Sequence, residues 1–554
     1  MTMGHAVLAI EQLQVNVAGP GGRAIVKGVS LQVMAGETVC VVGESGSGKS
    51  VMAFSAMGLL APDELRCVAG RILLDGENLL DASPARQREL RGTQLAMVFQ
   101  EPMTALNPVE KIGWQIDEVL RLHGCASKAH RRAQVLEMLR SVHMPDPVRI
   151  YEAYPHQLSG GQRQRVVISM ALILKPKLLI ADEPTTALDV TTQKQILALV
   201  RELQQQHGTA VLFITHDFGV VAEIANRVVV MNHGQVVETG TRDDILMRPA
   251  TAYTRTLVSS VPSLVPEARP PSQGAIVLQA SGLGKTYSQR RWFGRAQCVA
   301  AAQDIHFTLR RGEILGIVGE SGCGKSTVAR CIVRLQEPSS GAIHIHGVDI
   351  ARTRGRALRA LRQRVQIVFQ DPYRSLNPRV RVGESMIEGL ISHGMPRPQA
   401  MHRARALCAS VGVDAGLLER YPHQFSGGQR QRICIARALA LEPDILVADE
   451  AVSALDVSVQ AQVLALLQDI RQRTGVAILF ITHDLRVAAQ ICDNIMVMQH
   501  GRTIEQGPAA QVLTAPSQPY TNALIEAAPG RDWDFKNFRP LARSAVRQRH
   551  GAPS

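Results

Sequence analysis

A glycine-rich octapeptide that ends in Lys-Ser occurs twice in this chain of 554 residues, at 43–50 and again at 319–326. Each copy follows a short apolar run, 37–42 or 313–318, which we expect to form a buried strand. A glycine-rich turn between a strand and a helix directs backbone N–H groups and the helix N-terminus at one point, and this stabilises the charge of a polyphosphate. A chance turn could account for one copy, but two copies in the same context indicate phosphate binding.

The side chains of the octapeptides extend this prediction. Lys49 and Lys325 can supply positive charge to the β- and γ-phosphates of a nucleotide, and the hydroxyls of Ser50 and Ser326 can bind the accompanying Mg²⁺. At Cys323 the sequence is compatible with a small residue tolerated in a turn and also with a redox-sensitive thiol. The predicted nucleotide contacts lie in each octapeptide and at the residue that follows it. They are Gly43, Ser45, Gly46, Ser47, Gly48, Lys49, Ser50 and Val51 in the first half, and Gly319, Ser321, Gly322, Cys323, Gly324, Lys325, Ser326 and Thr327 in the second.

Two further apolar runs, 178–181 and 445–448, each end in a pair of carboxylates. The pairs are Asp182 with Glu183 and Asp449 with Glu450. At the C-terminal edge of a buried parallel strand, the first carboxylate of a pair can hold Mg²⁺ through water. The second can act as general base for the water that attacks the γ-phosphate. An acidic helix cap is the alternative, but it leaves the matched spacing from each phosphate loop unexplained.

The distance between equivalent residues is almost constant along the chain. It is 276 residues for the lysines at 49 and 325, 270 for the glutamines at 100 and 370, and 267 for the aspartates at 182 and 449. A near-constant offset indicates two homologous domains that differ by small loop insertions. We therefore predict a first domain at 1–260, a proline-rich linker at 261–275, a second domain at 276–528 and a C-terminal tail at 529–554. The tail could dock on a partner or fold back on its own domain.

Composition places the chain among cytosolic globular proteins. Apolar residues make up 45% of it, and no apolar run approaches the length of a membrane span or forms a secretory signal. The nine cysteines lack paired short spacing, so we expect reduced thiols without disulfides or a zinc site. The net charge of +13 suits nucleic acid, anionic lipid or polyphosphate equally. The densest basic stretch, 352–364, is best explained as a solvated amphipathic helix.

A third duplicated motif carries a family resemblance. Residues 158–165 and 425–432 both contain Ser-Gly-Gly-Gln before a helical stretch, which makes a second anion-receptive helix N-terminus that the same nucleotide cannot readily reach. This motif resembles the signature of ATP-binding cassette proteins. Residues 187–189, 454–456, 215–217 and 482–484 complete the motif set of that family in its usual order. The resemblance covers nearly the whole chain.

The resemblance implies an α/β fold with two tandem P-loop NTPase domains of the ABC ATPase type. Each would have a RecA-like core, an antiparallel β subdomain and an α-helical subdomain. It also implies a head-to-tail pairing of the two domains around two ATP molecules with Mg²⁺, so that the Lys49 loop faces Ser426 and the Lys325 loop faces Ser159. The implied signature contacts are Ser159, Gly160, Gly161 and Gln162, and Ser426, Gly427, Gly428 and Gln429. The implied catalytic residues are Glu183, Glu450, His216, His483, Gln100 and Gln370, and the implied metal ligands are Ser50, Gln100, Asp182, Ser326, Gln370 and Asp449.

The two halves differ from the family pattern at the adenine position. Tyr287 lies where the family places an aromatic residue against adenine, but the first half has Val15, Asn16 and Val17 there. We therefore expect weaker adenine binding at the first site. Both halves keep their glutamate and histidine, so we expect two hydrolytically competent sites.

The flanking segments 100–108 and 370–378, and the domain ends around Tyr253 and Tyr520, resemble the peptide and nickel importers of the family. This implies a peripheral protein on the cytoplasmic face of the inner membrane that drives two permease subunits, with an extracytoplasmic binding protein supplying the cargo. No iron–sulfur cluster is expected, since no cysteine follows Cys492. The alternative is a soluble cassette mechanoenzyme on ribosomes or nucleic acid, but the short proline-rich linker disfavours it and no nucleic-acid partner is expected. An exporter would normally bring its own membrane spans.

Overall fold

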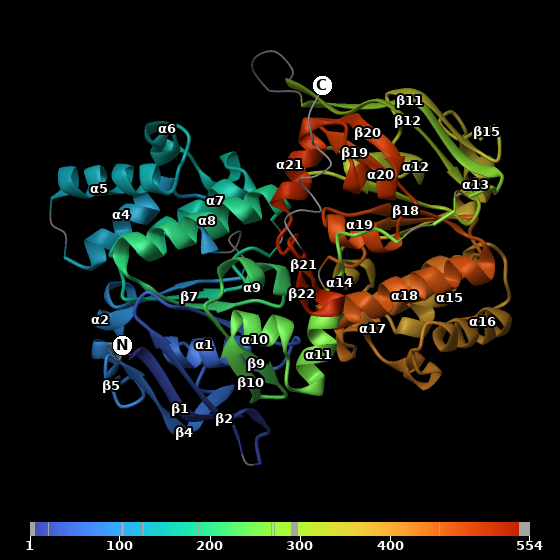
Figure 1. Cartoon of the computed structure of the whole chain (residues 1–554). Coiled ribbons are helices and arrows are strands. Elements are labelled where there is room, and N and C mark those ends of the chain that lie inside the picture. Colours follow the sequence, from blue (N-terminus) through green and yellow to red (C-terminus); the bar gives the residue numbers. More distant parts are fainter. Residues whose placement is uncertain are drawn as a thin grey trace. The chain divides into compact units, whose positions relative to one another are not determined.

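The computed structural model describes residues 6–19, 21–100, 105–124, 127–186, 188–267, 269–270, 272–289, 297–453 and 455–541 (Figure 1). The chain divides into two compact units. Residues within 6–188, 192–261 and 532–541 form the first unit, and residues within 189–191 and 262–531 form the second. The chain therefore enters the second unit at Pro262 and returns to the first at Asp532.

A six-stranded sheet forms the centre of the first unit, with strand order β10-β9-β3-β8-β7-β6. All its neighbouring strands pair in parallel except the edge strand β10, which is antiparallel to β9. Every residue of β3, β7 and β8 is buried, as the continuous apolar runs of these strands predict. The strands are β3 (Thr38–Val42), β6 (Leu95–Val98), β7 (Leu178–Asp182), β8 (Ala210–Ile214), β9 (Arg227–Asn232) and β10 (Gln235–Thr241).

A second, antiparallel sheet lies beside this one in the first unit, with strand order β2-β1-β4-β5. Its strands are β1 (Ala6–Val17), β2 (Ala24–Met34), β4 (Leu65–Leu74) and β5 (Glu77–Asn78). Leu8 and Val29 of this sheet, Met52 of helix α1 (Lys49–Met57) and Ile180 of β7 belong to one buried apolar cluster. The helix that follows the first phosphate loop therefore packs into the core between the two sheets.

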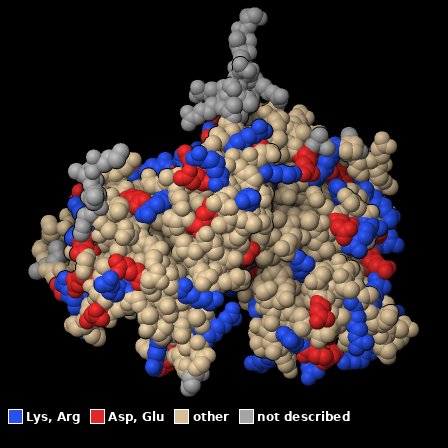
Figure 2. All heavy atoms as spheres, turned by 60° about the horizontal axis from the view of Figure 1, so that its bottom comes forward, with Lys and Arg blue, Asp and Glu red and all other residues tan. Residues whose placement is uncertain are grey.

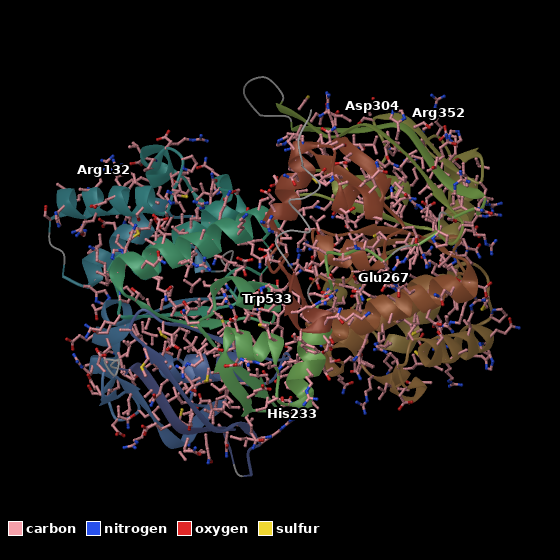
Figure 3. The ribbon with its side chains drawn as sticks, viewed as in Figure 1. Arg132, His233, Glu267, Asp304, Arg352 and Trp533 are labelled. Atoms are coloured by element: carbon pink, nitrogen blue, oxygen red, sulfur yellow. The ribbon has the colours of Figure 1, made fainter. Side chains whose placement is uncertain are left out.

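A helical segment completes the first unit. Its elements are α4 (Ile112–Leu122), α5 (Lys128–Ser141), α6 (Pro147–Glu152), the short η1 (Pro155–Gln157) and α7 (Gly160–Leu172). Arg131 of α5 pairs with Asp117 of α4 at 2.9 Å, and both side chains are mostly buried. Arg132, labelled in Figure 3, places its guanidinium 5.2 Å from the ring centre of Tyr151 in α6. These contacts hold the helices that lead into the Ser-Gly-Gly segment.

The second unit repeats this architecture. Its central sheet has the order β16-β17-β18-β13-β19-β20, and its antiparallel sheet has the order β12-β11-β14-β15. The strands are β11 (Ile276–Gln289), β12 (Gln297–Arg310), β13 (Ile314–Val318), β14 (Ser340–Ile345), β15 (Val348–Asp349), β16 (Val365–Val368), β17 (Ile445–Asp449), β18 (Ala477–Ile481), β19 (Asn494–Gln499) and β20 (Arg502–Pro508). Its helices include α12 (Lys325–Ile332), α15 (Val382–Ser392), α16 (Arg397–Ser410) and α17 (Gly427–Leu439). The predicted α/β fold with duplicated domains is confirmed.

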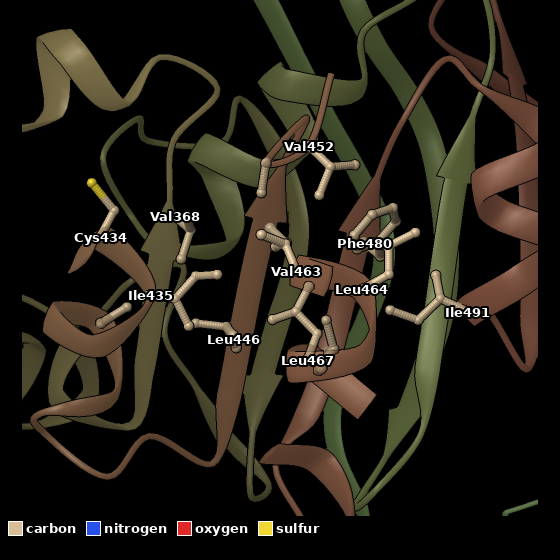
Figure 4. Packing of buried hydrophobic residues seen from close by; sticks show 14 of the residues in the cluster. Val368, Cys434, Ile435, Leu446, Val452, Val463, Leu464, Leu467, Phe480 and Ile491 are labelled. Atoms are coloured by element: carbon tan, nitrogen blue, oxygen red, sulfur yellow. The ribbon is translucent and has the colours of Figure 1, made fainter. Parts of the chain in front are cut away.

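Two long helices cover the central sheets, α8 (Val190–His207) in the first half of the chain and α18 (Val457–Thr474) in the second. Figure 4 shows how α18 lies on its sheet, with Val463, Leu464 and Leu467 facing Leu446 of β17 and Phe480 of β18. Burying a side chain of this size stabilises the fold by about 1.5 to 3 kcal/mol. The strand ends that carry the paired carboxylates are thus anchored by a packed core.

The basic stretch forms an amphipathic helix, as predicted. Helix α13 (Gly355–Arg364) keeps Leu361 partly buried against the core while its arginines are exposed. Arg352, labelled in Figure 3, precedes this helix and is exposed as well. On the face seen in Figure 2, Lys and Arg lie in small groups among Asp and Glu.

The described part of the C-terminal tail consists of β21 (Trp533–Asp534), η4 (Phe535–Asn537) and β22 (Arg539–Pro540), and it belongs to the first unit. Trp533 is labelled in Figure 3, and the next residue but one, Phe535, is almost fully buried. The turn η4 packs against helix α11 (Ala252–Ser259). Among the helices that the structure describes, none has the length and hydrophobicity of a membrane span.

Candidate functional site

Each phosphate loop connects a buried strand to a helix, as predicted. The first lies between β3 and α1, and the second lies between β13 and α12. Gly43 has φ of +151°, and a Cβ there would lie 2.2 Å from the carbonyl oxygen of Met231. Gly319 has φ of +149° and faces Met498 at 2.3 Å in the same way. Only glycine fits these two positions, because the adjacent strand leaves no room for a side chain.

The two lysines are buried and point back over their own loops. Lys49 donates hydrogen bonds from Nζ to the carbonyl oxygens of Gly43 at 2.8 Å and Glu44 at 2.9 Å, and to Ser47 Oγ at 3.3 Å. Lys325 donates to the carbonyl oxygens of Gly319 and Glu320, both at 2.8 Å. The exposed fractions are 6% for Lys49 and 4% for Lys325, so each ammonium is shielded from bulk water within reach of the loop. Val51 and Thr327 lie in the first turns of the helices that these lysines begin.

The loop serines meet the first carboxylate of each pair. Ser50 donates to Asp182 Oδ1 at 3.2 Å, and Ser326 donates to Asp449 Oδ1 at 3.0 Å. Burial raises the pKa of Asp182 and of Asp449, although the serine hydrogen bonds and the nearby lysines oppose this. A hydroxyl and a carboxylate are oxygen ligands of the kind that Mg²⁺ prefers. The donor set at both loops therefore fits the predicted metal.

The second carboxylate of the first pair, Glu183, receives three side-chain contacts. Gln100 Nε2 donates to its Oε2 at 3.0 Å, Thr186 Oγ1 donates to the same oxygen at 3.1 Å, and His216 Nδ1 lies 3.1 Å from Oε1. Burial acts to raise the pKa of Glu183, but the His216 and Thr186 contacts and the charges of His216 and Lys49 outweigh it and hold that pKa at about 2. The carboxylate is thus held ionised and in one orientation.

In the second unit, Glu450 has a related set of contacts. Gln370 Nε2 donates to its Oε2 at 2.7 Å, and His483 Nδ1 lies 3.4 Å from the same oxygen. Burial opposes ionisation, but His483 and the charge of Lys325 lower the pKa of Glu450 below its ordinary value. Ser453, which corresponds to Thr186, donates to the backbone oxygen of Glu450 at 3.0 Å and not to its carboxylate.

Both glutamates have left-handed backbone conformations, with φ of +47° at Glu183 and +48° at Glu450. For a residue with a side chain, this conformation costs on the order of 1 to 3 kcal/mol and is found mostly at functional sites. In each case the backbone N–H donates to the neighbouring strand, to Ile214 at 3.0 Å and to Ile481 at 2.9 Å. The fold thus holds each carboxylate in a strained turn directly after its strand.

We expect Thr186→Val to shift the acid limb of the pH–activity profile to higher pH. The substitution removes a hydrogen bond that stabilises the ionised form of Glu183, so the depressed pKa of that carboxyl rises and protonation begins at higher pH. The measurement is kcat for ATP hydrolysis from pH 2.5 to 8.5, because a carboxyl whose pKa is about 2 begins to be protonated only at the low end of that range. Ser453→Ala is the matched control, because its hydroxyl contacts only the backbone of Glu450 in the structure. Superimposable limbs for Thr186→Val and the parent chain would contradict the role of Thr186.

The Ser-Gly-Gly segments begin helices, as predicted. Ser159 caps α7, with its Oγ accepting from the backbone of Gln162 at 3.3 Å while Gln162 Oε1 accepts from the backbone of Ser159 at 3.0 Å. Ser426 and Gln429 make the same reciprocal pair at the start of α17, at 3.3 and 3.0 Å. The glycines after each serine, Gly160 with Gly161 and Gly427 with Gly428, form the first helical turns. Backbone N–H groups at such a terminus favour an anion.

The predicted adenine residue, Tyr287, lies on β11 with 38% of its surface exposed. Its hydroxyl donates to Gln336, and Lys285 Nζ lies 5.4 Å from the ring centre. The corresponding position in the first unit has Val17, which is 40% exposed. Cys323 is buried, which raises the pKa of its thiol and disfavours the reactive thiolate.

The structure thus brings together, in each unit, the loop lysine and serine, the paired carboxylates, the glutamine and the histidine. Thr186 is a site residue that the sequence analysis did not include. Its recurrence as Ser453, three residues after the corresponding glutamate, was the available signal. Residues 101–104, which follow Gln100, and Ala187 and Ala454 of the other family motifs lie outside the described residues.

Two family models match the chain. A model described as ABC transporter matches residues 26–186 and 302–453. A model described as oligopeptide/dipeptide transporter, C-terminal region, matches residues 237–298 and 504–550. Both models match twice, once in each half, in agreement with the duplicated architecture.

Curated relatives align over almost the whole chain. The glutathione import ATP-binding protein GsiA of Pectobacterium atrosepticum is 44% identical over 566 residues, which cover 95% of this chain and 90% of the relative. The peptidoglycan transport ATP-binding protein YejF of Agrobacterium fabrum is 45% identical over 530 residues, covering 94% of this chain and 96% of the relative.

Among solved structures, the dimeric bacterial ABC transporter cassette MJ0796 aligns with 42% of this chain and 98% of its own, at 27% identity and a TM-score of 0.38. The family matches in both halves, and the relatives that align over most of the chain, agree with the duplicated architecture. The chain hydrolyses ATP, carries two ABC cassettes and belongs to the ABC transporter family.

Proposed function

We propose that this protein uses ATP hydrolysis to power the uptake of peptides or related small solutes through separate membrane permeases. The observation that carries this proposal is the match of both halves to the oligopeptide/dipeptide transporter C-terminal region. The names of the relatives, one for glutathione import and one for peptidoglycan transport, point to peptide-containing cargo. The ribosomal alternative offers no account of these C-terminal segments.

In each unit, we assign the general base to the glutamate that follows the buried strand. Glu183 and Glu450 accept the proton of the attacking water, while His216 and His483 orient them from 3.1 and 3.4 Å. Gln100 and Gln370 contact the same carboxylates and position the water. Lys49 and Lys325 stabilise the negative charge of the phosphates that their loops bind.

The residues at both loops fit Mg²⁺, which Ser50 and Asp182 would hold at one loop and Ser326 and Asp449 at the other. When bound, the ion would neutralise charge on the β- and γ-phosphates. The side-chain oxygens of Gln100 and Gln370 would be available as further ligands, because it is their amide nitrogens that contact the glutamates.

We further propose that the two cassettes pair head to tail. The Lys49 loop would then share one ATP with Ser426, and the Lys325 loop would share another with Ser159. The capped N-termini of α7 and α17 support this, because each offers backbone N–H groups to an anion. One polypeptide carries both cassettes, which raises their effective concentration for each other.

The expected partners are two permease subunits in the inner membrane, with this protein on their cytoplasmic side and an extracytoplasmic binding protein delivering the cargo. The segments after Gln100 and Gln370 would contact the permeases. In the second unit this segment is held in shape by Asp371, which accepts hydrogen bonds from the backbone N–H groups of Tyr373 and Arg374 at the start of α14 (Pro372–Ser375).

The test is co-expression of the tagged chain with a pair of peptide-importer permeases from the same genome, followed by affinity purification from detergent-solubilised membranes. We expect both permeases to co-purify and peptide uptake into vesicles to require ATP. A tagged chain that leaves the permeases behind and binds RNA in a salt-dependent way would support the ribosomal alternative and sink the proposal.

For the adenine position, we expect Tyr287→Ala to weaken ATP binding at the second site by about 1 to 3 kcal/mol, the range for loss of a stacked aromatic ring. The affinity is measured by titration calorimetry in a Lys49→Ala background, in which ATP binding at the first site is weakened and the second site dominates the signal.

Tyr287→Phe separates the ring from the hydroxyl that contacts Gln336. If the ring stacks on adenine, the phenylalanine variant keeps its affinity. Equal weakening in the alanine and phenylalanine variants would assign the effect to the hydroxyl and rule out stacking.

A further inference from the structure

In both units, a tyrosine hydroxyl from the C-terminal part of the cassette lies against the phosphate loop. The backbone N–H of Glu44 donates to Tyr253 Oη at 3.3 Å, and the backbone N–H of Glu320 donates to Tyr520 Oη at 3.3 Å. Tyr253 lies on α11 and Tyr520 on α21 (Pro519–Ala527), each about 200 residues after its loop. The same contact at the same distance in two units of different sequence is a repeated feature of the fold.

The contacted loop residue is the one that the lysine also holds. Glu44 donates to Tyr253 through its N–H and accepts from Lys49 Nζ through its carbonyl oxygen at 2.9 Å. Glu320 is placed in the same way between Tyr520 and Lys325, whose Nζ lies 2.8 Å from the carbonyl oxygen. Each tyrosine therefore contacts the backbone N–H of the glutamate, while the lysine contacts the carbonyl oxygen of the same glutamate.

A glutamate on the edge strand of each central sheet accepts hydrogen bonds from the residues just before the helix that carries the tyrosine. Glu238 of β10 accepts from the backbone N–H of Ala250 at 2.7 Å and from the N–H and hydroxyl of Thr251 at 3.0 and 2.9 Å, just before α11. Glu505 of β20 accepts from the N–H and hydroxyl of Ser517 at 2.8 and 2.9 Å, just before α21. The start of each helix is thereby fixed relative to the central sheet.

We propose that Tyr253 and Tyr520 are positioning residues that hold the second residue of each phosphate loop in its nucleotide-binding conformation. The proposal deepens the nucleotide sites assigned above and rests on them. Both tyrosines lie inside the segments that match the oligopeptide/dipeptide transporter C-terminal region. They give that region a part in ATP binding, exerted through the loop and without contact to the phosphates.

The experiment uses Tyr253→Phe, Tyr520→Phe and the double variant in the full chain, since phenylalanine keeps the ring and removes only the hydroxyl. We expect KM for ATP and the dissociation constant to rise about three- to tenfold in the double variant, as for the loss of one hydrogen bond at each site, with kcat within about twofold of the parent. Each single variant should affect the site in its own unit.

Matched controls lie on the same helices and away from the loops. Ser259→Ala on α11 removes a hydroxyl that contacts the carbonyl oxygen of Thr256, and Asn522→Ala on α21 removes an exposed amide. Both controls should keep the parent KM. Thermal unfolding of all variants is followed in parallel, and the phenylalanine variants should unfold at the parent temperature.

An unchanged KM in the double variant would overturn the proposal, as would a loss of kcat that only follows a lower unfolding temperature. If the two phosphate loops are not the nucleotide sites, the result is different, because the Lys49→Ala and Lys325→Ala variants would then bind ATP as the parent does. That result would remove the basis of the positioning role as well.

Discussion

A chain with both Glu183→Gln and Glu450→Gln is expected to bind ATP but to hydrolyse it about 10²- to 10⁴-fold more slowly than the parent. The size of this decrease in rate follows from the usual contribution of a positioned general base. Glutamine is nearly isosteric with glutamate, so the contacts with Gln100 and His216 can adapt, but its amide cannot accept the proton of the attacking water. Turnover is measured as phosphate release, and retained ATP as radiolabelled nucleotide after gel filtration.

Two exposed carboxylates on other helices give the matched control, since Glu137→Gln on α5 with Glu388→Gln on α15 makes the same chemical change outside both phosphate loops. This control should turn over at the parent rate. The single variants Glu183→Gln and Glu450→Gln separate the sites, and each should lose the contribution of its own cassette. Parent-like phosphate release from the double variant would exclude these glutamates as the bases.

The second large effect is expected at the loop lysines. Lys49→Ala should weaken ATP binding at the first site about 10- to 100-fold, and Lys325→Ala should do the same at the second. Each lysine is buried within its loop, and we expect its ammonium to exchange hydrogen bonds with carbonyl oxygens for hydrogen bonds with phosphate when ATP binds. Hydrogen bonds to charged groups are worth about 1.5 to 3 kcal/mol each. Fluorescent-nucleotide titration measures the affinity and the number of sites.

Because both lysines are buried, loss of the stem could disturb the loop as well as the charge. Lys49→Met and Lys325→Met keep most of the stem and should lose nearly as much affinity as the alanine variants. The exposed Lys128→Ala, at the start of α5, controls for a change in net charge alone and should bind ATP normally. Two-site stoichiometry with parent affinity in the Lys49→Ala chain would contradict the assignment of its loop.

The sequence predicted those parts of the site that depend on local pattern. A buried strand followed by a glycine-rich turn places Lys49 at a helix start, and an apolar run before Asp182 and Glu183 places both at a strand end. The duplication then supplied a second copy of each pattern, at Lys325 and Glu450. These features need only a few consecutive residues, and the structure confirms the strands and helices that carry them.

The parts of the site that could not be predicted from the sequence depend on contacts between residues far apart in the chain or on the orientation of single side chains. Thr186 and Ser453 carry similar hydroxyls at equivalent positions, but the hydroxyl of Thr186 contacts a carboxylate and that of Ser453 a backbone oxygen. Tyr253 reaches Glu44 only because β10 and α11 fold back beside the first loop. In the sequence, the segment around Tyr253 indicates only the family, and the tail is compatible with a partner or with its own domain as its docking site.

The route of the polypeptide has a topological consequence. It leaves the first unit at Val261 and rejoins it at Asp532, and Phe535 is buried there. The chain passes between the two units twice, so a single cut in one of the two connections leaves the other connection intact. Cleavage between 262 and 275 would therefore leave the halves joined as a nicked heterodimer, retained by the return segment.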